Sequence, residues 1–102
     1  MGRRLLRVLG VLFAASSAAA VAFPPEVAEF IEGREVCEHF RQEPWPEGHS
    51  AEDSERREFI SSQIERFCRG SDRALRQLKD KYKSNWEVMQ RLEKYEEKIN
   101  DE

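Results

Sequence analysis

Two cysteines restrict the folds open to this chain more than any other feature of its sequence. Cys37 and Cys68 are the only cysteines, so a single intramolecular disulfide is possible. An even cysteine count in a small exported domain is typical of a disulfide framework. Closing this loop would stabilise the fold by about 3–4 kcal/mol, because it restricts the unfolded chain. We therefore predict a Cys37–Cys68 bond between segments that are distant in the sequence.

Export is predicted from the first 22 residues. Three arginines within the first seven residues precede an apolar stretch that ends in small residues, and Ala20 and Ala22 form an A-x-A cleavage site. This layout is typical of a secretory signal peptide. We expect residues 1–22 to be the signal peptide, with cleavage after Ala22 or, as a second choice, after Ala20. An uncleaved anchor is the alternative, but the 16 uncharged residues 8–23 are few for a membrane span.

Cleavage would leave residues 23–102 as a single small domain. These 80 residues carry 14 basic and 20 acidic side chains, which is a net charge of −6. An acidic chain argues against nucleic acid and against anionic membrane surfaces as partners. We therefore expect a secreted or periplasmic protein with no nucleic-acid partner and, after signal cleavage, no membrane partner. A domain this small buries a modest core, so a disulfide would contribute a large share of its stability.

Apolar residues recur at helical spacing throughout the mature chain, and no stretch alternates as a strand does. A first helix is expected over residues 25–40, because proline suits the first turn of a helix. Two prolines then require a connector over residues 42–49. A second helix follows Ser50, whose spacing from Asp53 resembles a capping box, and Gly70 provides a left-handed stop.

Two further helices are expected towards the C-terminus. Ser71 or Asp72 would cap the third helix and Ser84 the fourth, which keeps a four-three-four apolar rhythm from Val88 to Ile99. All the predicted helices carry narrow apolar stripes, which are formed by Val27, Phe30, Ile31, Cys37, Ile60, Ile64, Phe67, Cys68, Leu75, Leu78, Tyr82, Val88, Leu92, Tyr95 and Ile99. A bundle is the simplest arrangement that buries them. The predicted fold is therefore all-α, a small bundle of three or four helices stapled by one disulfide.

Two cysteine motifs resemble those of a known family. "CEHFRQE" begins at Cys37 and "CRGSD" at Cys68. They are similar to the patterns C-x-H-[FW]-x-G-E and C-x-G-[ST]-D of a family of small exported bacterial proteins, and the likeness extends to about Tyr82. Gln42 replaces the glycine of the first pattern, which removes the basis for a tight turn there. The resemblance implies export, a disulfide and helices. A weaker likeness to the helical domain of LprI-type lysozyme inhibitors is a fold-level analogy, which does not transfer function.

The segment 37–49 holds one cysteine and both histidines of the chain. With Cys68 they form a Cys₂His₂ set that by count would suit zinc or copper(I). Cys37 and His39 lie two positions apart on a helix and point away from each other, and an oxidising compartment would consume the thiols first. We therefore expect no metal and no cofactor. The alternative function is a metal-binding or redox-sensing periplasmic protein that uses Cys37, His39, His49 and Cys68.

The same segment offers little for catalysis. His39 beside Glu38 and Glu43 could form an acid–base pair, but a histidine near a helix end is more simply explained by its favourable interaction with the helix dipole. No serine or cysteine nucleophile with a spaced base accompanies it. We therefore expect a non-catalytic protein with no catalytic residues.

Trp45, between two prolines, is the recognition candidate of the chain, and Trp86 is a weaker one. Flanking prolines hold the backbone extended, so an exposed ring there loses little entropy on binding. In this interpretation the chain is an exported module that binds or inhibits an envelope protein. The partner-binding surface would comprise His39, Glu43, Trp45 and His49. The alternative, which the sequence favours slightly, is that Trp45 folds down as a buried lid beside Phe40 and Phe59.

Overall fold

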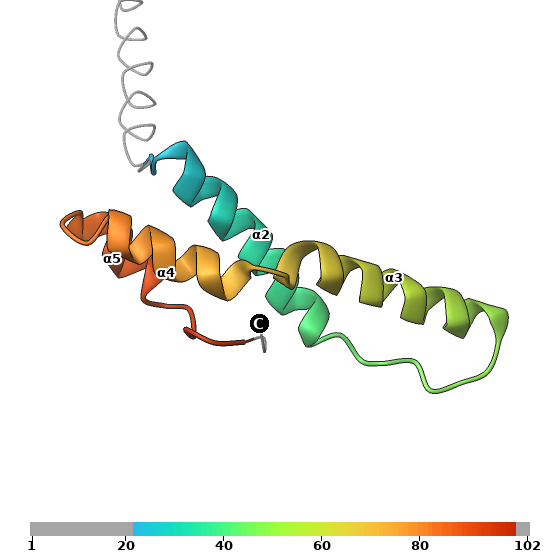
Figure 1. The fold of residues 1–102 in the computed structure, drawn as a ribbon. Helices are drawn as coiled ribbons and strands as arrows, with labels where there is room; N and C mark the ends of the chain where they lie inside the picture. Colours follow the sequence, from blue (N-terminus) through green and yellow to red (C-terminus); the bar gives the residue numbers. More distant parts are fainter. Residues whose placement is uncertain (1–21, 100–102) are drawn as a thin grey trace, which may run out of the picture.

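The computed structural model describes residues 22–99, and within this part the chain is helical and has no strand (Figure 1). The elements are α2 (Pro25–Arg41), α3 (Ala51–Cys68), α4 (Ser71–Lys81) and the short α5 (Trp86–Leu92). The predicted all-α fold and its disulfide are confirmed. Except for its last residue, the predicted signal peptide lies outside the described part. None of the helices within residues 22–99 combines the length and the apolar character needed to cross a lipid bilayer.

The first three helices are arranged around a crossing point. α2 packs against α3 and α4 where these two helices meet, and α3 and α4 extend away from it in opposite directions (Figure 1). The link between α3 and α4 passes through Gly70, whose φ of 74° is the left-handed conformation that glycine adopts without strain. The sequence predicts this stop, and the structure confirms it.

The main core lies where α2, α4 and the C-terminal part of the chain meet. Its buried apolar residues are Val27, Leu75, Leu78, Val88, Leu92 and Tyr95. A second, smaller centre surrounds the disulfide, where Cys37 is fully buried and Cys68 is 1% exposed. Ile60 is the other buried residue of α3. Nine residues of the predicted stripes are therefore buried in two centres, and the other six are partly buried. The disulfide occupies the centre with fewer apolar side chains.

One arginine is buried at the junction of these elements. Arg34 of α2 is 1% exposed. Its guanidinium donates from Nε to Glu38 at 3.0 Å and from Nη1 to the hydroxyl of Ser71 at 2.9 Å, and it lies 3.4 Å from the carboxylate of Asp72. Its Cζ also lies 5.5 Å from the ring centroid of Tyr95. A buried charge needs such partners to offset its lost hydration. The Ser-Asp pair of the second cysteine motif therefore has a structural role.

The last helix is shorter than the sequence predicts. The apolar rhythm continues to Ile99, but α5 ends at Leu92 and the chain goes on in turns and bends. The carbonyl of Glu96 accepts a hydrogen bond from Arg34, and the N–H of Ile99 donates to both carboxylate oxygens of Asp72 at 3.0 Å. Backbone groups that find partners in the interior do not need a helix to satisfy them. Tertiary contacts thus replace the predicted helical turns.

Two predicted helix caps are wrong. α4 begins at Ser71, with Gly70 and no side chain at its N-cap, because the side chains of Ser71 and Asp72 are turned inwards to Arg34. α5 is capped by Asn85 in place of Ser84, and the Asn85 side chain accepts a backbone N–H of the first turn at 3.1 Å. In both places a polar residue of the expected type lies within one position of the cap, so the sequence indicates the boundary and misassigns the residue.

Tyr95 should titrate well above an ordinary tyrosine. It is 7% exposed, and its hydroxyl donates to Glu35 at 2.6 Å. Burial, together with this hydrogen bond, raises the pKa of Tyr95 from 10.0 to about 12. Because the folded state favours the neutral phenol, its stabilisation is complete below pH 10 and is lost as the pH rises to about 12.

We therefore expect the free energy of unfolding, measured by urea titration with circular dichroism, to fall across this alkaline interval. It should fall less steeply in Tyr95→Phe, which cannot ionise. Equal alkaline slopes in the two proteins would contradict the assignment.

Candidate functional site

The connector, residues 42–50, joins α2 to α3 and carries most of the residues that the sequence nominates for partner binding. Arg57 of α3 holds it in place. The Nη1 atom of Arg57 donates to the carbonyl oxygens of Pro46 and Gly48, both at 2.8 Å. These two hydrogen bonds fix the backbone on either side of Glu47. The connector therefore follows a defined path beside α3.

Gly48 allows a close approach at the end of the connector. A Cβ atom at this position would lie 2.1 Å from Oδ2 of Asp53. That oxygen accepts a hydrogen bond from the hydroxyl of Ser50 at 2.9 Å, and Ser50 accepts the N–H of Asp53 at 3.1 Å. This is the N-cap that the sequence predicts for α3. A side chain larger than that of glycine would have to displace the capping carboxylate.

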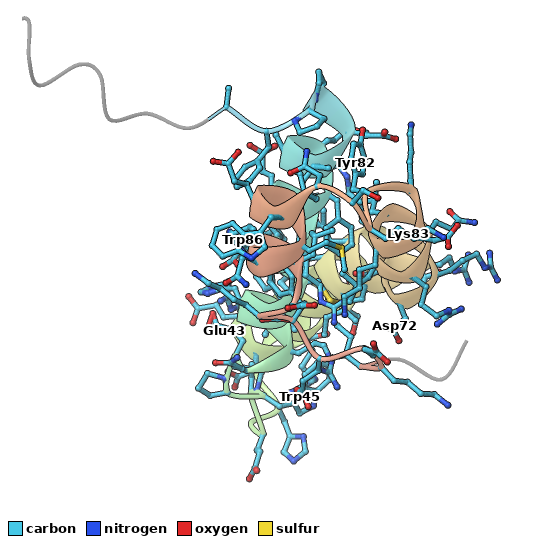
Figure 2. The ribbon with its side chains drawn as sticks, turned by 90° about the vertical axis from the view of Figure 1, so that its left-hand side faces the viewer. Glu43, Trp45, Asp72, Tyr82, Lys83 and Trp86 are labelled. Atoms are coloured by element: carbon cyan, nitrogen blue, oxygen red, sulfur yellow. A yellow bond between two sulfur atoms is a disulfide. The ribbon has the colours of Figure 1, made fainter. Side chains whose placement is uncertain are left out.

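Trp45 is 51% exposed on this connector. Two shallow hollows, of 470 and 360 Å³, adjoin it, and Trp45 and Arg57 line both of them. The first hollow is completed by α3 side chains, namely Ser54, Glu58, Ser61 and Ser62. Figure 2 shows Trp45 towards the lower end of the view and Trp86 higher up, on α5. The Trp45 ring therefore lies beside polar side chains on the surface of α3.

The lid interpretation of Trp45 is wrong, because a lid on the core would be buried. Phe40 and Phe59 instead contact each other edge to face, with ring centroids 5.5 Å apart. The guanidinium of Arg56 covers Phe59 at 5.5 Å from its centroid. Phe59 remains 45% exposed, so this pair forms a second aromatic surface feature, at residues that the lid interpretation places beside a buried Trp45.

The structure brings His39 near Glu43 without forming a tight pair. His39 Nε2 lies 3.9 Å from Oε1 of Glu43, whereas Arg56 Nη2 reaches the same oxygen at 2.5 Å. The imidazole is 64% exposed and packs edge to face on Phe40. Because the carboxylate is engaged by Arg56, it is poorly placed to act with His39 as an acid–base pair. His49 lies further along and lines the smaller hollow beside Trp45.

The four residues of the metal alternative are not assembled as ligands. The sulfur atoms of Cys37 and Cys68 are bonded to each other at 1.98 Å and buried, whereas His39 and His49 are exposed. Metal ions are bound by thiolates, which a disulfide does not provide. In the part of the chain that the structure describes, no group of three or more His, Cys, Asp or Glu side chains could hold an ion.

Sequence patterns missed Arg57, the residue that positions the connector. Its acceptors are carbonyls that lie eleven and nine residues earlier in the chain. Motifs and helical periodicity carry no information about such a contact, since any residue type can supply a carbonyl. The one available signal is that Arg57 lies two turns from the connector on α3, within reach of an arginine side chain.

No protein-family model, curated protein or solved structure matches this chain. The likeness of its two cysteine motifs to exported bacterial proteins therefore stays a prediction from the residues. Function has to be inferred from the chemistry of the exposed side chains, and the connector with the adjoining α3 is where aromatic, basic and acidic groups lie beside a fixed backbone.

Proposed function

We propose that the chain is an exported, non-catalytic binding module that uses the connector to recognise an envelope protein. The observation that carries this proposal is the 51% exposure of Trp45 on a backbone fixed by Arg57. A ring on a fixed backbone loses little conformational entropy when it binds. Tryptophan is also among the residues that most often dominate the binding energy of an interface. Trp45 is therefore the anchor of the proposed surface.

Polar groups of both charges lie close to this anchor in the chain or in the hollow beside it. Glu43, two residues before Trp45, pairs with Arg56 and lies near His39, and His49 lines the smaller hollow beside the ring. Interfaces typically combine an apolar centre with a polar rim whose groups keep some contact with water. The side chains near Trp45 fit this pattern, with Trp45 as the apolar centre and the charged and histidine side chains as the rim.

A secreted or periplasmic location is part of the same proposal. Cys37 and Cys68 form a disulfide, which suggests a non-reducing environment because cytosolic thiols are kept reduced. The composition of residues 1–22 supports secretion or a periplasmic location.

Trp45→Ala should abolish partner capture and leave the fold nearly as stable as before. Half of the ring is exposed, so its truncation should cost well under the about 3–5 kcal/mol of a buried tryptophan. Capture is measured with a photoreactive residue at Glu47, beside Trp45, in protein exported by the producing cell. The cross-linked product is identified by mass spectrometry, and thermal melts report stability.

Trp86→Ala is the matched control, because Trp86 is 71% exposed and belongs to α5. We expect this variant to retain the cross-link. A Trp45→Ala protein that still cross-links, or that loses as much stability as a buried tryptophan would, contradicts the proposal. Free thiols that bind zinc in the native protein would favour the metal or redox alternative.

A further inference from the structure

α4 and its flanks are basic in an acidic chain. Residues 69–83 carry six basic and two acidic side chains, a net charge of +4, whereas the remainder of the chain after the predicted signal peptide carries −10. Three of the six, Arg69, Lys79 and Lys81, are paired with glutamates outside this segment. The rest of the basic charge lies on Arg73, Arg76 and Lys83, all of which are exposed.

Arg73 and Arg76 form what we call the arginine face of α4. They lie three positions apart, which makes them neighbours on the helix surface. Within residues 22–99, neither arginine makes an ion pair, a hydrogen bond or a ring contact. Of the nearest carboxylates along the helix, Asp72 faces Arg34 and Asp80 lies 4.0 Å from Lys83 in an exposed pair.

This placement opposes the local rules of helix stability. Arg73 is the third residue of α4, and the positive end of the helix dipole disfavours cations there. Arg73 and Arg76 also repel each other as neighbouring like charges. A glutamate in place of Arg73 would remove both unfavourable effects. Acidic residues are common in this chain, which has 20 of them. Local choices that oppose the fold are expected at functional sites.

We propose that the arginine face binds an acidic, extended segment of a protein. Guanidinium groups form paired hydrogen bonds with carboxylates, and arginine clusters are a recurrent means of recognising acidic motifs. A flat anionic surface such as a membrane would bring the −10 remainder of the chain into repulsive proximity. A narrow segment need contact only Arg73 and Arg76, and the carboxylates of Glu26 and Glu97 beside α4 are already paired with Lys81 and Lys79. The arginine face is distinct from the connector, so the inference is independent of the role of Trp45.

The experiment measures binding of a fluorescent oligo-glutamate peptide to the mature protein by anisotropy, at low and at physiological salt. The double variant Arg73→Glu/Arg76→Glu should bind at least about tenfold more weakly than the native protein. Its melting temperature should be unchanged or higher, because glutamate is favoured in the first turn of α4, where Arg73 lies. The matched control is Arg41→Glu/Lys94→Glu, which makes the same charge change at two exposed positions outside α4. It should bind within about twofold of the native protein.

Each other outcome overturns the inference. Equal losses in the two double variants would mean that net charge alone governs binding. Failure of the native protein to bind the peptide would remove the proposed ligand class. Binding of anionic lipid vesicles in preference to the peptide, with the same dependence on Arg73 and Arg76, would assign the face to a membrane.

Discussion

Replacing Arg34 with methionine should lower the free energy of unfolding by about 3–5 kcal/mol, because it removes the positive charge that faces the buried carboxylate of Asp72. Asp72 and Arg34 are each 1% exposed, and the ion pair spans 3.4 Å. Methionine also removes the donors to Ser71 and to the carbonyl of Glu96. A small domain has a total stability of about 5–15 kcal/mol, so this one change should remove a large part of it.

Urea titration followed by circular dichroism measures this loss, with Arg69→Met as the control. Arg69 also pairs with a carboxylate, that of Glu65, but the two side chains are 79% and 63% exposed. An exposed pair contributes at most about 1 kcal/mol, so the control should remain close to the native protein. If the two variants were destabilised alike, the burial of Arg34 would not be what makes it important.

Hydrogen exchange should show where the Arg34→Met protein opens first. The chain after α5 is held by Arg34 through Glu96 and by Asp72 through Ile99. With Arg34 removed, the amides of residues 93–99 should lose protection at lower denaturant than those of α2 and α4. Tyr95 is the one residue of this segment in the main core, so few other apolar contacts oppose such local opening.

The helix boundaries that the sequence predicts well are those fixed by nearby residues. Pro25, Ser50 and Gly70 act on the backbone within one turn, so their effects can be read from the chain alone. The end of the last helix depends on Arg34 reaching Glu96, which lies 62 residues away. No local pattern contains that contact, and the apolar rhythm up to Ile99 is consistent with a longer helix.

The candidate site likewise has one feature that nearby residues determine and one that depends on a distant contact. Two prolines predict an extended connector around Trp45, and the structure has one. Whether the ring is exposed depends on where the connector runs, and this is set by Arg57 through carbonyl groups that every sequence possesses. Arg34 was missed for a related reason: an arginine in a helix with many glutamates resembles a surface residue until its partners are known.

The second large effect should come from the disulfide, because α3 buries few apolar side chains. Its buried residues are Ile60 and Cys68, whereas α4 buries Leu75 and Leu78 in the main core. The bond links Cys68 to a residue 31 positions earlier, and closing a loop of that length stabilises a fold by about 3–4 kcal/mol. The pairing of α2 with α3 should therefore depend on this bond more than on apolar contacts.

Cys37→Ala/Cys68→Ala should accordingly melt at a much lower temperature than the native protein and lose helical signal, chiefly from α3. Native protein treated with a reducing agent should behave in the same way, which separates loss of the bond from loss of the side chains. The connector starts where α2 ends and leads into α3, so loosening α3 should also release the hydrogen bonds of Arg57 and increase the mobility of Trp45.

The intact mass of the exported protein should correspond to a chain that begins at Phe23 and lacks two hydrogens. A mass that fits free thiols, or an unchanged melting temperature in the double variant, would show that α3 is held in place without the disulfide.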